Sequence, residues 1–196
     1  MTRILFNKGE LSVTTQLLPC LIHGVHKAGS SLFTMTLLAD LFNQGNKVLF
    51  ICGYPMARDE FLSQTKNPQN KILVECESDL NSAYSKDVIM VKKENTDWFI
   101  RLAQNLPNDD NRITLIKNFE LFDYKILDAI KNSREIIFSG DLDQCSFNYE
   151  LLKFSFASYI YFSQPQINSI HMCPVLEKYQ GYLWGRQLGG IVSIDN

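Results

Sequence analysis

Residues 21–33 read LIHGVHKAGSSLF, and this stretch decides the fold that the sequence predicts. An apolar run ends at Gly24, four residues separate it from Gly29, and residues 30–45 then read SSLFTMTLLADLFNQG. That second segment carries apolar residues at helical spacing and ends at Gly45, where a helix C-cap belongs. The stretch therefore predicts a buried strand, a glycine loop and a helix in succession.

The alternation of strand and helix continues along the chain. Further strands are predicted at residues 47–53, 71–76, 87–93, 112–119, 134–141 and 158–165, and helices at 96–106, 121–133 and 149–157. Continuous apolar strands of this kind suit a parallel sheet that is covered on both faces. Residues 169–180 and 182–195 resemble two antiparallel strands joined around Gly181 and Gly185. We expect an α/β fold in one domain (1–196), with a doubly wound, mostly parallel sheet and a C-terminal antiparallel β-hairpin.

Composition narrows the class of protein. The 45% hydrophobic and 20% charged content is typical of a soluble globular protein, and a net charge of −2 gives no general reason to expect nucleic-acid binding. Five cysteines without C-x-x-C spacing indicate reduced thiols rather than a structural zinc site. No apolar stretch is long enough for a signal peptide or a membrane span, so we expect a cytoplasmic protein without membrane partners.

The glycine loop has the outline of a phosphate-binding loop, G-x-x-x-x-G-K-[ST], whose lysine reaches the phosphates of a nucleotide. Here Ser30 stands at the lysine position, and Ser31 at the position of the Mg²⁺-binding hydroxyl. The N-terminus of the following helix would stabilise an anion, and Lys27 lies inside the loop within reach of a phosphate. The alternative is a tight turn in which Ser30 or Ser31 caps the helix.

The order of the elements resembles the RecA-like P-loop ATPases across residues 17–194. The strand, the loop GVHKAGSS, the helix, the strand in GNKVLFICG and the later RITLIKNFE and REIIFSGD follow one another as in that family. The KaiC and RadA branch is the most similar, because its members also end in antiparallel strands with a basic-aromatic motif, here LEKYQGYLWGRQLGGIVSI. The resemblance implies a P-loop fold, ATP or ADP as the ligand, and oligomers formed with RecA-like subunits.

The chain departs from that family at the positions that carry catalysis. The family's second motif ends in an Asp that holds Mg²⁺, whereas here Lys117 or Asn118 stands there and Glu120 is the nearest acid. The catalytic Glu would fall at residues 52–54, which read CGY. With Ser30 in the lysine position, three charges needed for phosphoryl transfer are missing together. We therefore expect a pseudo-ATPase with no catalytic residue and no metal ligand.

Residues 136–145, IIFSGDLDQC, are similar to the G-D-x-x-Q motif of superfamily 1 helicases, whose Gln senses the γ-phosphate. This similarity makes Gln144 a candidate sensor and Asp141 its support. The alternative is a strand–helix turn in which Gly140 and Asp141 provide turn and capping chemistry.

The last predicted hairpin combines aromatic and basic residues. They are Lys178, Tyr179, Tyr182, Trp184 and Arg186. Such a set can stack on nucleic-acid bases, form a subunit interface, or pack on the hairpin's own core.

Three functions follow from these observations. The first is a scaffold or regulatory subunit of a protein complex, with a vestigial or weak nucleotide site made by Gly24, Lys27, Gly29, Ser30, Ser31 and Gln144. The second is a nucleotide-binding ATPase in DNA repair or recombination. The third is a nucleic-acid-binding accessory factor that works through the hairpin.

Overall fold

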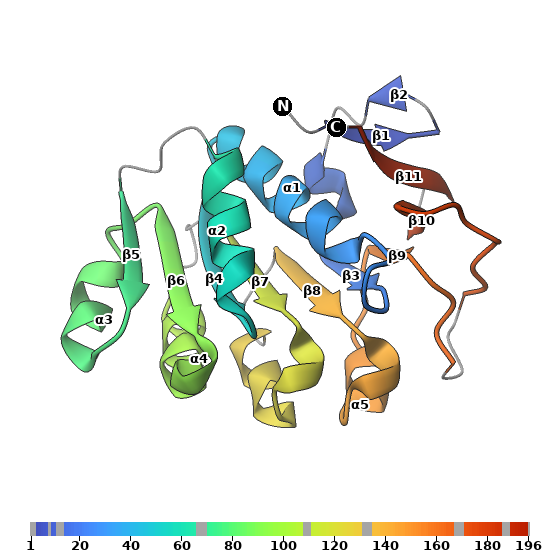
Figure 1. Ribbon diagram of the computed structural model, residues 1–196. Helices are drawn as coiled ribbons and strands as arrows, with labels where there is room; N and C mark the ends of the chain where they lie inside the picture. Colours follow the sequence, from blue (N-terminus) through green and yellow to red (C-terminus); the bar gives the residue numbers. More distant parts are fainter. Residues whose placement is uncertain are drawn as a thin grey trace.

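The computed structural model describes residues 3–7, 9–10, 14–65, 70–107, 111–130, 135–166, 171–185 and 189–195. Its centre is an 11-stranded sheet with the strand order β2-β1-β11-β10-β9-β3-β8-β7-β4-β6-β5 (Figure 1). The strands are β1 (Arg3–Phe6), β2 (Gly9–Glu10), β3 (Cys20–His23), β4 (Lys47–Cys52), β5 (Lys71–Val74), β6 (Val88–Lys92), β7 (Arg112–Lys117), β8 (Ile136–Gly140), β9 (Ser158–Tyr161), β10 (Gln180–Gly185) and β11 (Gly189–Asp195).

Helices connect most of the parallel strands. The α-helices are α1 (Ser30–Asn43), α2 (Pro55–Gln64), α3 (Glu77–Ala83), α4 (Thr96–Gln104) and α5 (Asn148–Leu152). The 3₁₀ turns are η1 (Thr14–Leu17), η2 (Lys93–Asn95), η3 (Phe119–Leu121), η4 (Tyr124–Ile130) and η5 (Leu142–Gln144). Among the residues that the structure describes, no helix is long and apolar enough to cross a membrane.

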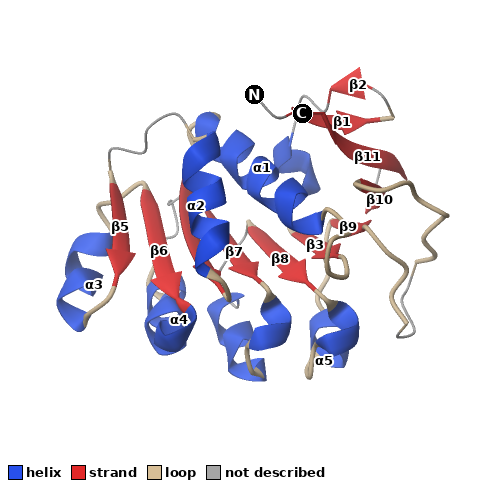
Figure 2. Cartoon of the chain, in the orientation of Figure 1, coloured by secondary structure: helices blue, strands red, loops and turns tan. Residues whose placement is uncertain are grey.

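The sheet is mostly parallel, as the continuous apolar runs predict. The strands from β9 to β5 pair in parallel, whereas β10, β11, β1 and β2 pair antiparallel to their neighbours. Helices α1 and α2 cover one face, and α3, α4 and α5 cover the other (Figure 2). Successive residues of β4 belong to different cores: Leu49 packs with α3 and α4, and Phe50 with α1 and α2. The expectation of a doubly wound sheet with a C-terminal antiparallel hairpin is confirmed.

Two predicted elements differ from the structure. A helix is expected at residues 121–133, but the described part, residues 121–130, forms 3₁₀ turns. The Asp123 carboxylate accepts a hydrogen bond from the backbone N–H of Lys125 at the start of η4 (2.9 Å). The strand expected at 169–180 begins only at Gln180, because the preceding segment contains Pro174, which lacks a ladder donor.

The glycines expected at the hairpin turn lie inside strand β10 instead. A Cβ atom on Gly181 would stand 3.0 Å from the ring of Phe162, so a larger residue there would require that ring to shift. The connection between β10 and β11 falls at residues 186–188, which lie outside the described residues. Arg186, one of the expected interaction residues, is therefore not placed.

The parallel arrangement brings the carboxyl ends of several strands to one edge of the sheet. Strand β3 ends at His23, β4 at Cys52, β7 at Lys117 and β8 at Gly140. The pairing aligns His23 with Gly140, and Cys52 with Lys117. In open α/β sheets this edge is where ligands bind.

Candidate functional site

The loop between β3 and α1 leaves the first turn of the helix without a side-chain cap. Gly29 is the N-cap residue, in a left-handed conformation with φ of 103°, and it supplies no side-chain cap to the helix start. Ser30 and Ser31 are the first helical residues, so the alternative in which one of them caps the helix is wrong. Backbone N–H donors of the first turn therefore remain available to an anion.

Both loop glycines are required by close packing. A Cβ atom on Gly24 would stand 2.7 Å from the Cβ and Oγ atoms of Ser30. A Cβ atom on Gly29 would stand 2.9 Å from Cδ1 and 3.0 Å from Cα of Tyr179, and the positive φ adds strain for any larger residue. The loop thus packs both on itself and on the segment that leads into β10.

A cleft of about 700 Å³ opens above the loop at the carboxyl edge of the sheet. All the residues that the sequence predicts for a nucleotide site line this cleft: Gly24, Lys27, Gly29, Ser30, Ser31 and Gln144. Other lining residues come from α2, from the ends of β7 and β8, and from the segment before β10. They include Glu60, Lys117, Asn118, Glu120, Gly140, Asp141 and Tyr179. The structure therefore brings the sequence-predicted set together and adds charged residues that the sequence did not assign to the site.

Lys117 is the last residue of β7 and the most unusual group in the cleft. It is only 3% exposed. Burial lowers the pKa of its ammonium, and the negative charges of Glu120 and Glu60 partly offset this effect. Within the described part of the chain its side chain forms neither a hydrogen bond nor an ion pair. A buried lysine thus lines the cleft without a direct partner.

Glu120 connects the ends of β7 and β8. Its carboxylate accepts hydrogen bonds from the backbone N–H of Asp141 (3.0 Å) and from the side-chain amide of Asn118 (3.4 Å). A Cβ atom on Gly140 would stand 2.1 Å from its Oε2 atom, so the glycine leaves room for this carboxylate. These hydrogen bonds hold the partly buried Glu120 carboxylate in place between the two strand ends.

Glu60 is a cleft residue that the sequence analysis did not assign to the site. It lies on α2, between the buried residues Ala57 and Phe61 of the same helix. Burial raises the pKa of its carboxyl group, and Lys117 opposes that rise. The helical spacing after Pro55 was the available signal, since it places residue 60 beside the face that packs on the sheet.

Gln144 lies in η5, exposed, and its backbone N–H bonds to the carbonyl of Asp141 (3.3 Å). The side chain of Asp141 caps η5 through the N–H of Asp143 (3.0 Å). The capping role expected of Asp141 is therefore confirmed, while the sensor role of Gln144 stays a prediction.

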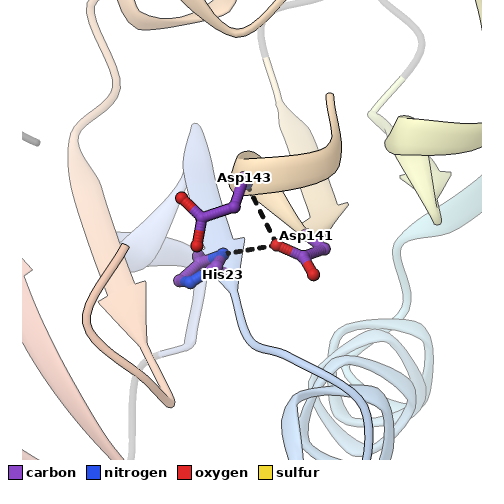
Figure 3. Close-up of side chains that lie close together, drawn as sticks. All are labelled: His23, Asp141 and Asp143. Atoms are coloured by element: carbon purple, nitrogen blue, oxygen red, sulfur yellow. Dashed lines mark hydrogen bonds and ion pairs between the residues drawn. The ribbon is translucent and has the colours of Figure 1, made fainter. Parts of the chain in front are cut away.

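His23 lies close to two carboxylates, as Figure 3 shows. Ligand atoms of His23, Asp141 and Asp143 all fall within 4.8 Å of one another. However, Nδ1 of His23 accepts a hydrogen bond from Leu142 N–H (3.1 Å), and Nε2 contacts the Ser163 hydroxyl (3.2 Å). Burial lowers the pKa of His23, which favours the neutral ring. Both ring nitrogens are engaged, so the cluster fixes the β8 turn and offers no free nitrogen to a metal.

The described hairpin residues divide between the cleft and a partly buried aromatic cluster. Tyr179, with φ of 66°, contacts Gly29, and the Nζ atom of Lys178 lies 4.9 Å from the centre of its ring. Trp184 stacks on His171 with centroids 5.1 Å apart.

Trp184 also donates its indole N–H to the carbonyl of Met172 (3.1 Å), and the ring of Tyr182 lies 5.0 Å from it. Packing on the hairpin's own surroundings thus accounts for Tyr182 and Trp184. Strand β10 lies between β9 and β11, so it is not an open edge.

No model of a known protein family matches this chain, and no curated protein sequence matches it either. Among solved structures, the chain is similar to the genome-packaging NTPase B204 from Sulfolobus turreted icosahedral virus 2. In its complex with AMPPCP the TM-score is 0.59 at 15% identity, covering 88% of this chain and 95% of that one. In its complex with ATP-gammaS the TM-score is 0.57 at 14% identity, with coverages of 88% and 94%.

A second similar structure is EssC (ATPases 2 and 3) from Geobacillus thermodenitrificans. The TM-score is 0.56 at 14% identity, and the match covers 99% of this chain and 40% of that one. Together these similarities show that the chain has the fold of P-loop ATPases.

Proposed function

We propose that the chain is an ATPase-fold protein that does not hydrolyse ATP and acts as a scaffold or regulatory subunit of a protein complex. The observation that carries this proposal is the position of Lys117. It ends β7, where the RecA-like pattern requires a carboxylate for Mg²⁺, and it is a buried residue that lines the cleft.

The size of the electrostatic effect supports the absence of turnover. Two unit charges about 4 Å apart interact by about 4 kcal/mol at an effective dielectric constant near 20, so a divalent cation near the ammonium is repelled by roughly twice that amount. Ser30 adds no charge at the lysine position of the loop. Phosphoryl transfer depends on positioning and on neutralising the phosphates, so a site without the metal and the loop lysine has little catalytic power.

The strand order supports the finer assignment to the RecA-like class. Strand β8 lies between β3, which precedes the loop, and β7, which carries Lys117. We propose a single RecA-like domain that assembles with copies of itself or with other RecA-like subunits. Trp184 already stacks on His171 and bonds to Met172, which gives less support to the alternative in which the hairpin stacks on nucleic-acid bases.

Measurement of ATP hydrolysis by the purified chain with Mg²⁺ tests the catalytic part of this proposal. The control is the Gly29→Arg variant, whose side chain would block the loop. We expect the wild type and this variant to hydrolyse ATP at the same rate, and any hydrolysis common to both comes from a contaminant. A Mg²⁺-dependent rate present in the wild type and absent from the variant would overturn the proposal. Sedimentation of the purified chain tests the subunit role, and we expect it to sediment as an assembly. A monomer that also fails to assemble with RecA-like proteins would contradict this role.

A further inference from the structure

The N-terminus of α1 provides half of an anion site. This helix has 14 residues, begins after the left-handed Gly29, and has no side-chain cap. Its first backbone N–H groups and the positive end of its dipole face the cleft that Ser30 and Ser31 line. The other half of the site comes from a different element of the fold.

Lys117 provides this other half. Only 3% of this residue is exposed, and it lines the same cleft from the end of β7. Within the described part of the chain it has no hydrogen-bonding or ion-pair partner. Burying an ammonium without a partner is unfavourable, so a ligand that accepts its hydrogen bonds would relieve that cost.

The neighbouring carboxylates do not fill this role. Glu120 is held by Asp141 N–H and by Asn118, which occupy its two oxygens. Glu60 approaches from α2, and its own burial disfavours the charged form of its carboxyl group. The ammonium therefore lies near negative charge without forming a direct ion pair.

We propose that Lys117 and the N-terminus of α1 form a metal-free binding site for a single phosphate group. In this site the cation comes from β7 instead of from the loop, and no divalent cation takes part. This inference rests on the proposed absence of Mg²⁺-dependent turnover and adds the class of ligand.

The charge balance of the cleft favours a dianion over a triphosphate. Glu60, Glu120 and Asp141 line the cleft together with the cations Lys27 and Lys117. A nucleoside triphosphate without Mg²⁺ would bring about four negative charges beside these carboxylates, whereas one phosphate group brings about two. Inorganic phosphate and a nucleoside monophosphate share the required chemistry.

Isothermal titration calorimetry in the presence of EDTA tests the site, with inorganic phosphate, AMP and ATP as separate probes. We expect inorganic phosphate or AMP to bind the wild type, ATP to bind no more tightly than AMP, and added Mg²⁺ to leave the phosphate affinity unchanged. Tighter binding of AMP than of phosphate assigns the site to a nucleotide, and equal affinity assigns it to phosphate alone.

Lys117→Met should weaken this binding by about tenfold to a hundredfold, the contribution of a charge-assisted hydrogen bond. Lys92→Met is the matched control, because Lys92 also ends a parallel strand at this edge but is exposed and paired with Glu75. The control should bind as the wild type does.

Absence of phosphate and AMP binding to the wild type, undiminished binding to Lys117→Met, or binding only with Mg²⁺ would each overturn the inference. A thermal melt of Lys117→Met shows whether the variant is folded, and Lys117→Arg should restore part of the affinity. None of these outcomes depends on ATP turnover, so the inference and the proposed function fail separately.

Discussion

Lys117→Met exchanges a buried ammonium for an uncharged side chain of similar length, and this substitution should stabilise the folded protein. Replacing a buried ion pair by well-packed apolar residues is neutral or stabilises proteins by about 1–4 kcal/mol, and a buried charge without a partner has even less to offset its desolvation. Methionine is flexible enough to occupy the space of a lysine stem. Lys117 satisfies the condition, being 3% exposed and lacking a direct partner in the described part of the chain.

The neighbouring carboxylates reduce this gain. Glu120 and Glu60 raise the pKa of Lys117, which means that they stabilise its charged form. The substitution removes that attraction. Allowing about 1 kcal/mol for that loss leaves an expected increase of about 0–3 kcal/mol in the free energy of unfolding at neutral pH. Urea unfolding followed by the fluorescence of the two tryptophans measures it.

The stability difference between the variant and the wild type should depend on pH, which a difference in packing alone would not produce. Burial lowers the folded-state pKa of Lys117 below its ordinary value of 10.5. Between the lowered pKa and 10.5 the unfolded chain binds more protons than the folded chain, so the stability of the wild type rises with pH. The advantage of methionine should therefore be greatest below the lowered pKa and shrink as the pH approaches 10.5.

Two results would refute this reasoning. A decrease in stability on Lys117→Met would mean that the ammonium holds the ends of the strands together. A pH-independent difference between the variant and the wild type would mean that the charge is not the cause. Lys92→Met, which removes an exposed ion pair with Glu75, should change the stability by less than about 1 kcal/mol.

Three further predictions concern the surroundings of the cleft. Gly29→Ala should lower the free energy of unfolding by about 1–3 kcal/mol, because φ is 103° and the new Cβ would meet Tyr179; thermal unfolding measures this, and an unchanged midpoint would contradict it. Burial lowers the pKa of His23, so below pH 6.5 the unfolded chain binds more protons and the protein should lose up to about 1.4 kcal/mol per pH unit. His23→Gln should flatten that acid limb in urea unfolding at several pH values, and an equally steep limb would exclude His23 as its cause. Trp184→Phe removes the indole donor to Met172 and should cost about 1 kcal/mol in thermal unfolding without changing phosphate affinity; an altered affinity would show that the hairpin takes part in binding.

The strands and the loop were the predictable part of the fold. The segments at 47–53 and 112–119 are apolar throughout, which is the pattern of a strand covered on both faces. Helix α3 was not predicted, because only Leu80 and Ala83 of its seven residues are buried and its capping box begins at Cys76, an unusual N-cap residue. Strand β1 was also not predicted, since its place depends on pairing with the distant β11.

The site was predictable as a location but not as a set of contacts. The spacing of Gly24 and Gly29 and the order of the strands correctly placed the loop at the cleft. The approach of Tyr179 to Gly29 could not be predicted, because it joins segments far apart in the sequence and requires Tyr179 to adopt a left-handed backbone conformation. The sequence identified Lys117 only as a missing carboxylate; its burial without a partner is a tertiary property.

The two departures from the RecA-like pattern have a combined meaning that neither has alone. Ser30 removes a positive charge from the loop, and Lys117 places one at the end of β7, on the same cleft. If the site were only inactive, an uncharged residue at position 117 would avoid the cost of burying an ammonium. The buried charge is better explained by an anion that it binds. A cleft that can neutralise a phosphate but repels Mg²⁺ would bind without turnover, which is what a regulatory subunit requires of a ligand site.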